Sequence, residues 1–283
     1  MRVTLRLILA TGIAIAPAFA QEPTKPAAVL WIDREAIKEG RTVIHEKVEA
    51  EYVAAFRKAQ FPGHYFALAT MSGPNEVWFV QPMASFAANE EFEKATEKEP
   101  LKSALATLTE RDGELRESSR SYWAVYRPDM SYRPDTFKPE KMRFVTAETF
   151  RVRLGQEDAF MNGVQAYFGG YKKGNVDLCV QTYEVTAGAP AGTYLLFTMM
   201  DSMKVLDQEP ERMKAVMEGM GQEAFNKLMK DSGQVLLSIE DTLLEVKPGM
   251  SYPDKAMEEA DPAFWKPKMA MKAAIPASKK SGE

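Results

Sequence analysis

The sequence contains two histidines, His45 and His64, and both fall in its first half. Glu49 follows His45 by four residues, a spacing that brings two side chains together on one face of a helix. Two histidines and one carboxylate are a ligand set for a non-haem metal ion. The alternative is that His45 and Glu49 form an exposed helix pair while His64 stands at the start of a strand. Helical geometry puts His45 about 100° from the centre of its apolar stripe, so we favour the alternative and expect no metal and no cofactor.

Sulfur ligands are a second possible chemistry. Met213, Met217 and Met220 have the spacing that would let thioethers share a copper(I) ion. The same spacing is typical of a buried helical stripe, which Ala224 and Leu228 would extend, so packing is the expected role. The single cysteine, Cys179, lies in an alternating strand-like run and is expected to be a small buried residue without a disulfide partner.

Aromatic side chains are concentrated in the first half and could line a pocket for a flat, apolar ligand or form a plain core. The candidate pocket residues are His64, His45, Tyr52, Trp78 and Trp123. No phosphate-binding loop, dinucleotide-binding glycine pattern, nucleophile elbow or zinc-binding motif accompanies them. These residues therefore indicate a binding site more strongly than a reaction.

The first 20 residues have the features of a secretory signal peptide. Arg2 and Arg6 precede an apolar run from Leu7 to Ala16, and Ala18-Phe19-Ala20 supplies a cleavage pattern. The run is too short to cross a bilayer, which needs about 20 residues. We expect a periplasmic or secreted product of 263 residues that begins at Gln21, with residues 21–28 as a polar lead-in.

The charge of this product excludes two classes of partner. Without Arg2 and Arg6, 34 basic residues face 40 acidic ones, a net charge of −6. Nucleic acids and anionic membranes are bound by basic patches, so we expect neither as a partner once the signal is removed. The expected product is a soluble monomer or homodimer.

The elements that must position these residues occur twice in the same order. In the first half we expect a strand at 29–36, a helix at 41–60, a hairpin at 64–80, a helix interrupted at Pro100 and a strand at 121–126. The second half repeats this with a strand at 144–151, a helix from Gly155 to Gly169-Gly170, a hairpin at 176–199, a helix at 211–230 behind Pro210 and a strand at 235–246. Each half closes on a similar stretch, RPDMSY at 127 and KPGMSY at 247. The repetition indicates a duplicated unit of about 110 residues.

Strand–helix–strand–strand–helix–strand is the ferredoxin-like order. The expected units are residues 29–134 and 143–254, joined by a linker at 135–142. Strands such as EVWFV and SYWAVY are apolar on both faces, so each sheet needs a second cover, and the simplest cover is the sheet of the other unit. Residues 255–283 are expected to be a mostly disordered tail, with Phe264-Trp265 as a possible local anchor.

With this element order and the stretch EAEYVAAFRKAQFPGHYFALATMSGPNEVWFVQPMASFAA, residues 29–254 resemble the dimeric α/β-barrel superfamily, which includes antibiotic-biosynthesis-monooxygenase-like domains. The resemblance implies an α+β fold in which two four-stranded antiparallel sheets pack face to face. It does not imply one function, because the superfamily includes oxygenases, haem-handling enzymes and proteins without a known reaction. A tandem haem member would need an axial histidine in its second unit, which has none here.

The expected function is that of an exported barrel protein which binds a small apolar ligand or serves in assembly. The alternative is a cofactor-independent, monooxygenase-like enzyme that holds an aromatic substrate in the first-unit cavity, with His64 or His45 as proton acceptor.

Overall fold

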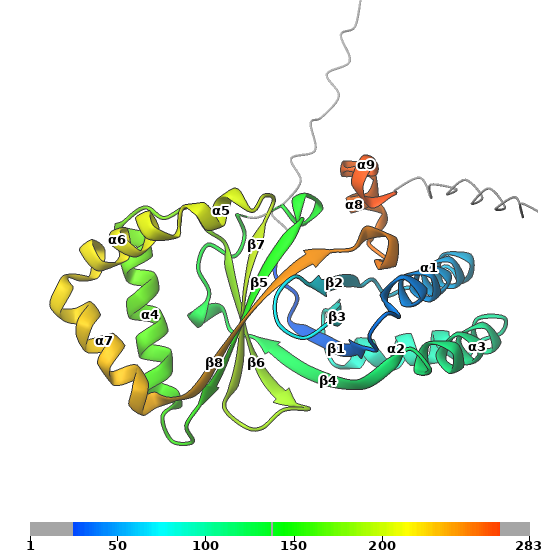
Figure 1. The fold of residues 1–283 in the computed structure, drawn as a ribbon, viewed down its shortest axis with the longest axis horizontal. Coiled ribbons are helices and arrows are strands. Elements are labelled where there is room, and N and C mark those ends of the chain that lie inside the picture. The colour runs from blue at the N-terminus through cyan, green and yellow to red at the C-terminus, as the bar shows by residue number, and fades with distance from the viewer. Residues whose placement is uncertain (1–24, 137, 267–283) are drawn as a thin grey trace, which may run out of the picture.

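The computed structural model describes residues 25–136 and 138–266, which form an α+β fold around one closed, eight-stranded antiparallel barrel (Figure 1). The strands are β1 (Val29–Ile37), β2 (Phe66–Thr70), β3 (Glu76–Met83), β4 (Arg116–Tyr126), β5 (Phe144–Val152), β6 (Val180–Ala187), β7 (Thr193–Met200) and β8 (Leu236–Val246). Their order around the barrel is β1-β3-β2-β8-β5-β7-β6-β4. Each half of the chain supplies four neighbouring strands, and the pairs β2–β8 and β4–β6 join the halves by hydrogen bonds. The predicted fold class is confirmed.

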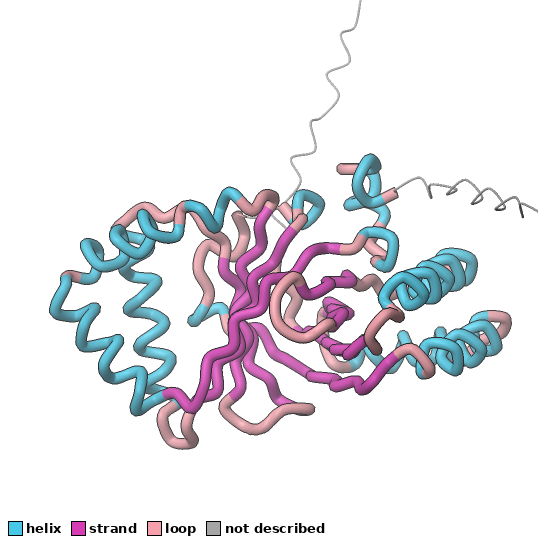
Figure 2. The backbone as a smooth tube through the Cα atoms, viewed as in Figure 1, coloured by secondary structure: helices cyan, strands magenta, loops and turns pink. Residues whose placement is uncertain are grey.

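Helices cover the outside of the barrel on two opposite sides (Figures 1 and 2). The helices are α1 (Thr42–Ala59), α2 (Ala87–Thr96), α3 (Leu101–Gly113), α4 (Glu157–Lys173), α5 (Lys204–Asp207), α6 (Glu209–Met220), α7 (Gln222–Val235), α8 (Lys255–Ala260) and α9 (Pro262–Trp265), with 3-10 turns η1 (Pro128–Met130), η2 (Pro139–Lys141) and η3 (Pro248–Met250). Helices α1 to α3 cover the strands of the first half, and α4, α6 and α7 cover those of the second. We call residues 29–134 the first unit and residues 143–254 the second unit.

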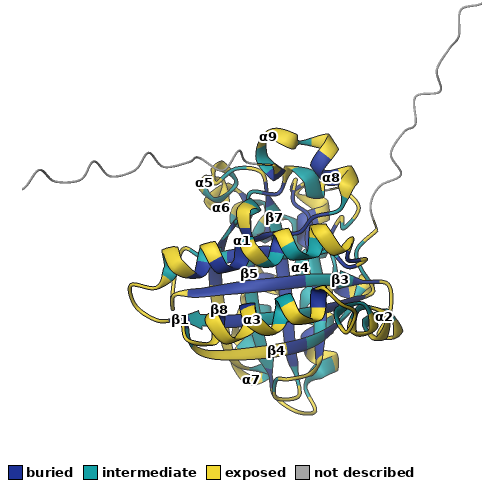
Figure 3. Cartoon of the chain, turned by 90° about the vertical axis from the view of Figure 1, so that its right-hand side faces the viewer, coloured by how far each residue is buried: buried dark blue, intermediate teal, exposed yellow. Residues whose placement is uncertain are grey.

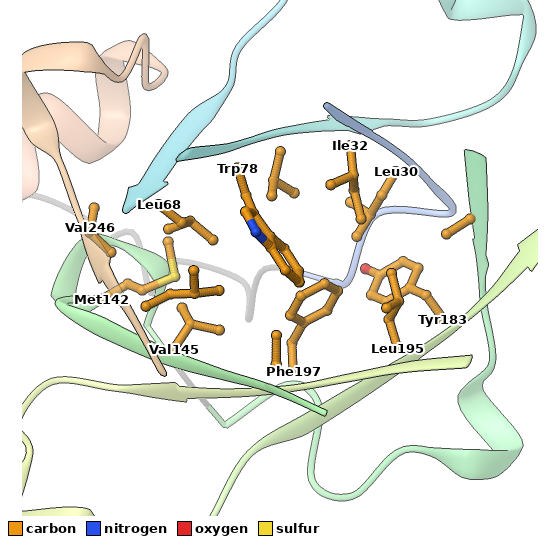
Figure 4. Packing of buried hydrophobic residues seen from close by; sticks show 14 of the residues in the cluster. Leu30, Ile32, Leu68, Trp78, Met142, Val145, Tyr183, Leu195, Phe197 and Val246 are labelled. Carbon is orange, nitrogen blue, oxygen red and sulfur yellow. The ribbon is translucent and has the colours of Figure 1, made fainter. Parts of the chain in front are cut away.

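The barrel interior is the main hydrophobic core, and both units fill it (Figure 4). Alternate residues of β1, such as Leu30 and Ile32, point inward and pack with Trp78 of the first unit and Leu195 and Phe197 of the second. On the outer face, residues such as Ile37 of β1 and Phe79 of β3 pack in a second core with Val53 of α1 and Leu101 of α3. Strands that are apolar on both alternate sets therefore lie between two cores, as their sequences predicted.

The repeated hexapeptides form matching turns directly after β4 and β8. Each begins with a 3-10 turn, η1 or η3, whose methionine is buried: Met130 is 0% exposed and Met250 is 3% exposed. The prediction that both methionines pack back on the barrel is confirmed.

Each of these turns is bound to the other unit. The serine hydroxyl of each hexapeptide accepts a backbone N–H from the opposite unit, and the following tyrosine forms an isolated β-bridge with it. The pairs are Ser131 with Thr182 and Tyr132 with Val180, then Ser251 with Ala67 and Tyr252 with Tyr65. The repeated letters thus hold the two units together at pseudo-symmetric places.

Two predicted helix boundaries are wrong. Helix α4 does not end at Gly169-Gly170 but continues to Lys173, because Gly170 serves close packing against α6: a Cβ there would lie 2.8 Å from Met220 and 3.1 Å from the Val216 carbonyl. The predicted helix at 211–230 is divided by Gly221, whose φ of 87° ends α6 and starts α7 in a new direction.

The methionines of α6 pack against the second-unit core, and Cys179 is buried, as predicted.

Disorder was predicted from residue 255, but residues 255–266 form α8 and α9 on the barrel (Figure 3). The Asp254 side chain caps α8 by accepting the Met257 N–H. Trp265 is 1% exposed, contacts the ring of Phe66, and donates its indole N–H to the Glu140 carbonyl. The predicted aromatic anchor is therefore present, and it orders the start of the tail.

The predicted signal peptide and residues 267–283 lie outside the described residues. Among the helices that the structure describes, none combines the length and the apolar character needed to cross a membrane.

Candidate functional site

A cavity of about 470 Å³ lies in the first unit between the outer face of the sheet and helices α1 to α3. Eight aromatic side chains line it: Trp31, Tyr52, Phe56, Phe61, Tyr65, Phe79, Phe92 and Trp123. Four ionisable residues on one side of it are close to His45: Glu35, Glu49, Asp112 and Arg116. We call these four residues and His45 the His45 cluster.

The His45 cluster is a compact buried group. The Nε2 atom of His45 lies 2.9 Å from Glu35 Oε2, 3.4 Å from Asp112 Oδ1 and 3.8 Å from Glu49 Oε1. Arg116 binds the second oxygens of Glu35 and Asp112, with 2.6 Å to Glu35 Oε1 and 2.9 Å to Asp112 Oδ2. His45 is 0% exposed, and all three carboxylates are buried. Three acids surround one arginine and one imidazole, so the cluster has an excess of negative charge when the acids are ionised.

Local structure explains how these residues meet. The alternation of β1 turns Glu35 outward toward α1, and the i, i+4 spacing on α1 turns both His45 and Glu49 toward the sheet. Asp112 lies in the last turn of α3, and Arg116 starts β4 at a bulge opposite Ile37. A bulge re-aims side chains at a strand end, and here Arg116 lies beside the carboxylates.

Burial shifts the protonation of the acids. Loss of solvent, together with the neighbouring charges of Glu35 and Asp112, raises the pKa of Glu49 well above its usual range. Burial, with the charge of Glu35 as a smaller cause, raises the pKa of Asp112 to about 6. Burial also raises the pKa of Tyr52 to about 12, and its hydroxyl donates to Thr109 at 3.0 Å. Near neutral pH Tyr52 is therefore a neutral hydrogen-bonding group.

The second unit has apolar residues at nearly all the matching positions. Each unit has a bulge at the same place, where Ile37 pairs with Arg116 in the first unit and Val152 pairs with Leu236 in the second. These two pairs fix which residue of the second unit matches each residue of the first. The counterparts of Glu35, His45, Glu49, Asp112 and Arg116 are, in the same order, Phe150, Phe160, Val164, Ser232 and Leu236. Phe150 and Phe160, the counterparts of Glu35 and His45, are in contact, with their ring centroids 5.3 Å apart. The fold therefore does not require charges at these positions.

The second unit has a larger cavity of about 950 Å³ at the matching place, between its sheet and helices α4, α6 and α7. Its wall is mostly apolar and includes Phe150, Phe160, Leu196 and Leu228. Glu148 projects into this wall from β5. Burial, with smaller contributions from the charges of Asp241 and Glu209, raises the pKa of Glu148 to about 7. Glu209, Asp231 and Asp241 also line this mostly apolar space, and Glu148 is the lining residue whose carboxyl group changes protonation near neutral pH.

The structure separates the five candidate pocket residues into three places. Tyr52 and Trp123 line the first-unit cavity, and His45 lies behind its acidic side. Trp78 is inside the barrel, where it lies under the Arg34 guanidinium at 4.0 Å and donates to Glu76. His64 is apart from the His45 cluster and contacts the ring of Tyr252. Burial lowers the pKa of His64.

Two features of these predictions need correction. His45 and Glu49 are not an exposed pair, because the buried face of α1 is rotated from the predicted apolar stripe: it includes both residues, while Ile44 is exposed. His64 does not join them, and Glu35 and Asp112 take its place.

The sequence interpretation missed Glu35, Asp112, Arg116 and Glu148. The alternation of VLWIDREAI was a usable signal, since it places Asp33 and Glu35 on the face of β1 that a helix must cover.

No protein-family model matches the chain, and no curated protein matches it. Several solved structures do. A provisionally assigned monooxygenase from Lactobacillus acidophilus NCFM is 6% identical, with 78% of this chain and 94% of that chain covered and a TM-score of 0.50. Another from Fusobacterium nucleatum subsp. nucleatum is 12% identical, with 82% and 100% covered and a TM-score of 0.51. An anthrone oxidase-like protein is 13% identical, with 77% and 91% covered and a TM-score of 0.50.

Identities this low show the architecture and leave the chemistry open. With its closed barrel of eight antiparallel strands and its helices on the outside, the chain has the fold of the dimeric α/β-barrel superfamily.

Proposed function

We propose that the chain is a binding protein for a small, largely apolar ligand held in the second-unit cavity. The observation that carries this proposal is the 950 Å³ space lined mainly by hydrophobic and aromatic side chains. Binding sites for small organic molecules have volumes of roughly 300–1,000 Å³ and a few polar groups in an apolar wall. The sequence alone had favoured the first unit for such a site.

Glu148 supplies the polar contact in this proposal. With a pKa of about 7, its carboxyl group is neutral in about half of the molecules near neutral pH and can then donate a hydrogen bond. Thr146 and Thr198 also line the cavity. The ligand class that fits is a flat or branched hydrocarbon body with one carbonyl or hydroxyl group.

Filling the cavity tests the proposal. Gly163 lines it from α4, and a Cβ at this position would meet only the end of the Leu228 side chain, at 3.0 Å. We expect wild-type protein to bind N-phenyl-1-naphthylamine, a neutral fluorescent probe, and Gly163→Phe to weaken the affinity at least about tenfold. Gly169→Phe is the matched control, because Gly169 lies on the same helix, is not part of the cavity wall and has open space around its Cβ position.

The control should keep its affinity within about twofold. Equal binding by both variants would contradict the second-unit site. Native mass spectrometry of protein from its own source should show a retained small molecule that Gly163→Phe lacks.

A monooxygenase-like enzyme is the second candidate. The observation in its favour is that the first-unit cavity combines aromatic walls with an acidic group around a buried histidine. Anthrone is a reasonable probe, because one structural neighbour is named as anthrone oxidase-like. Oxygen uptake with anthrone, measured in the presence of a chelator, should exceed the protein-free rate and fall in Trp123→Leu. An uptake equal to the protein-free rate would rule out this candidate for anthrone-type substrates.

We also propose that residues 1–20 direct export and are removed. Intact-mass measurement of protein expressed in a bacterial host should give a chain that begins at Gln21. A product that keeps residues 1–20 and stays in the cytoplasm would contradict this proposal.

A further inference from the structure

We propose that the His45 cluster of the first unit is a binding site for one divalent first-row metal ion. The ligands are His45, Glu35, Glu49 and Asp112, and the ion is Mn²⁺ or Zn²⁺. This site is independent of the apolar cavity in the second unit. The spacing of the donor atoms, an unpaired buried oxygen, the local charge and the contrast between the two units all favour a bound ion at this place.

The donor atoms are spaced as ligands of one ion are. One atom from each of the four residues lies within 4.8 Å of the other three. Two atoms that bind the same ion at about 2.1 Å lie about 3.4 Å apart in a tetrahedron, and about 4.2 Å apart across an octahedron. The distances from His45 Nε2 to the carboxylate oxygens of Glu35, Asp112 and Glu49 are 2.9, 3.4 and 3.8 Å, which are close to these values. An ion could enter with only small movements of the side chains.

One oxygen in the cluster has no hydrogen-bond donor. Asp112 is 2% exposed, and its Oδ1 atom has no hydrogen-bond partner among the described residues although it points toward His45 at 3.4 Å. A buried carboxylate oxygen without a donor is costly. A metal ion at this point would satisfy it, together with the inner oxygens of Glu35 and Glu49.

Arg116 holds the carboxylates in the orientation that such a site needs. Its guanidinium binds the outer oxygens of Glu35 and Asp112, which leaves their inner oxygens directed at His45. Outer contacts of this kind orient metal ligands in proteins. When a metal ion displaces the protons of the carboxyl groups, the three carboxylates and Arg116 together carry a net charge of −2, which a divalent cation balances.

The second unit shows that packing does not explain the cluster. At the matching positions, four of the five residues are hydrocarbon or aromatic, and the two phenylalanines are in contact. Because a buried ionic group is often no more stable than well-packed hydrophobic residues, a chain that needed only a core would have no use for these charges. One imidazole with three carboxylates is a nitrogen and oxygen set that suits Zn²⁺ and Mn²⁺.

Titration of the full mature protein with each metal alone tests the site. Protein first treated with a chelator should bind close to one equivalent of Zn²⁺ or Mn²⁺ by isothermal titration calorimetry, and the ion should raise its melting temperature. Glu49→Gln keeps the side-chain shape, removes one anionic ligand and should weaken binding at least about tenfold. Glu51→Gln is the matched control, because Glu51 lies on the same helix with an exposed side chain and should leave the affinity unchanged.

His45→Ala should also abolish binding, with circular dichroism as the test of folding. Glu49→Gln remains informative even if this variant does not fold. The proposal is overturned if neither ion binds wild-type protein, or if Glu49→Gln binds as tightly as Glu51→Gln. The same proteins tested with N-phenyl-1-naphthylamine separate this result from the apolar site, because the probe should bind all of them equally.

Discussion

Replacing Arg116 with leucine is expected to lower the free energy of unfolding by about 3 kcal/mol. The change leaves Glu35 and Asp112 buried without the cation that contacts both of them. Removing one partner of a buried ion pair costs roughly 3–5 kcal/mol, because the other charge remains uncompensated. We expect the lower end of this range, since the Arg116 side chain is 20% exposed. Urea unfolding followed by circular dichroism at neutral pH, with chelator present, measures the difference.

The second unit supplies the matched comparison. A variant with Glu35→Phe, His45→Phe, Glu49→Val, Asp112→Ser and Arg116→Leu has the full set of residues found there. It should be within about 1 kcal/mol of the wild type, since a buried ionic group can be exchanged for packed hydrophobic residues at little cost. The added rings can occupy part of the 470 Å³ cavity. If Arg116→Leu costs no more than this five-residue variant, the carboxylates do not depend on Arg116.

The second large effect is a pH dependence of stability that Glu148 causes. Its pKa is about 7 in the folded protein, against 4.5 for a solvated glutamate, and burial is the main cause. Below pH 4.5 the carboxyl group is protonated in both the folded and the unfolded state and has no effect. Between pH 4.5 and 7 the unfolded chain releases this proton and the folded protein retains it, so the free energy of unfolding falls as the pH rises. The total fall is about 3 kcal/mol, and it is complete above about pH 7.

Glu148→Gln should remove this component. The stability difference between wild type and Glu148→Gln, from urea unfolding at about pH 4.5 and about pH 8, should change by about 3 kcal/mol in favour of the glutamine at the higher pH. Asp158→Asn is the control, because Asp158 is exposed on α4, the helix that covers the cavity. Asp158→Asn should change the free energy of unfolding by the same small amount at both pH values. If Glu148→Gln also changed the free energy of unfolding by the same amount at both pH values, the Glu148 carboxyl group would be well solvated.

The sequence predicted the elements and their order because those depend on local patterns. Runs of alternating or continuously apolar residues located all eight strands. Because some strands are apolar on both faces, they also indicated that a second sheet covers the first. Boundaries that depend on tertiary packing were wrong. Gly170 lies inside a helix because α6 packs against it, and Gly221 divides a helix whose apolar stripe continues across the break.

The candidate site could be predicted only in part. Periodicity indicated that His45 and Glu49 share a helical face, but the partners that bury them come from β1, the end of α3 and the start of β4. The bulge that places Arg116 beside Asp112 depends on strand register, which local sequence does not specify. Hydrophobic content could not show that the larger cavity lies in the second unit, because a cavity is the space that packed helices leave unfilled.

Local patterns along the chain were enough to predict the α+β architecture, the repeated order of elements and the two matching turns. Those follow from spacing along the chain, and our inference of a duplicated unit has the same basis. The closed barrel was needed to show that the turns bind the opposite unit, that Trp78 belongs to the barrel interior, and that β1, α1 and α3 bring three acids around His45. The physical reason is that charge, burial and cavity volume are properties of residues distant in sequence, and these become neighbours only when the barrel closes.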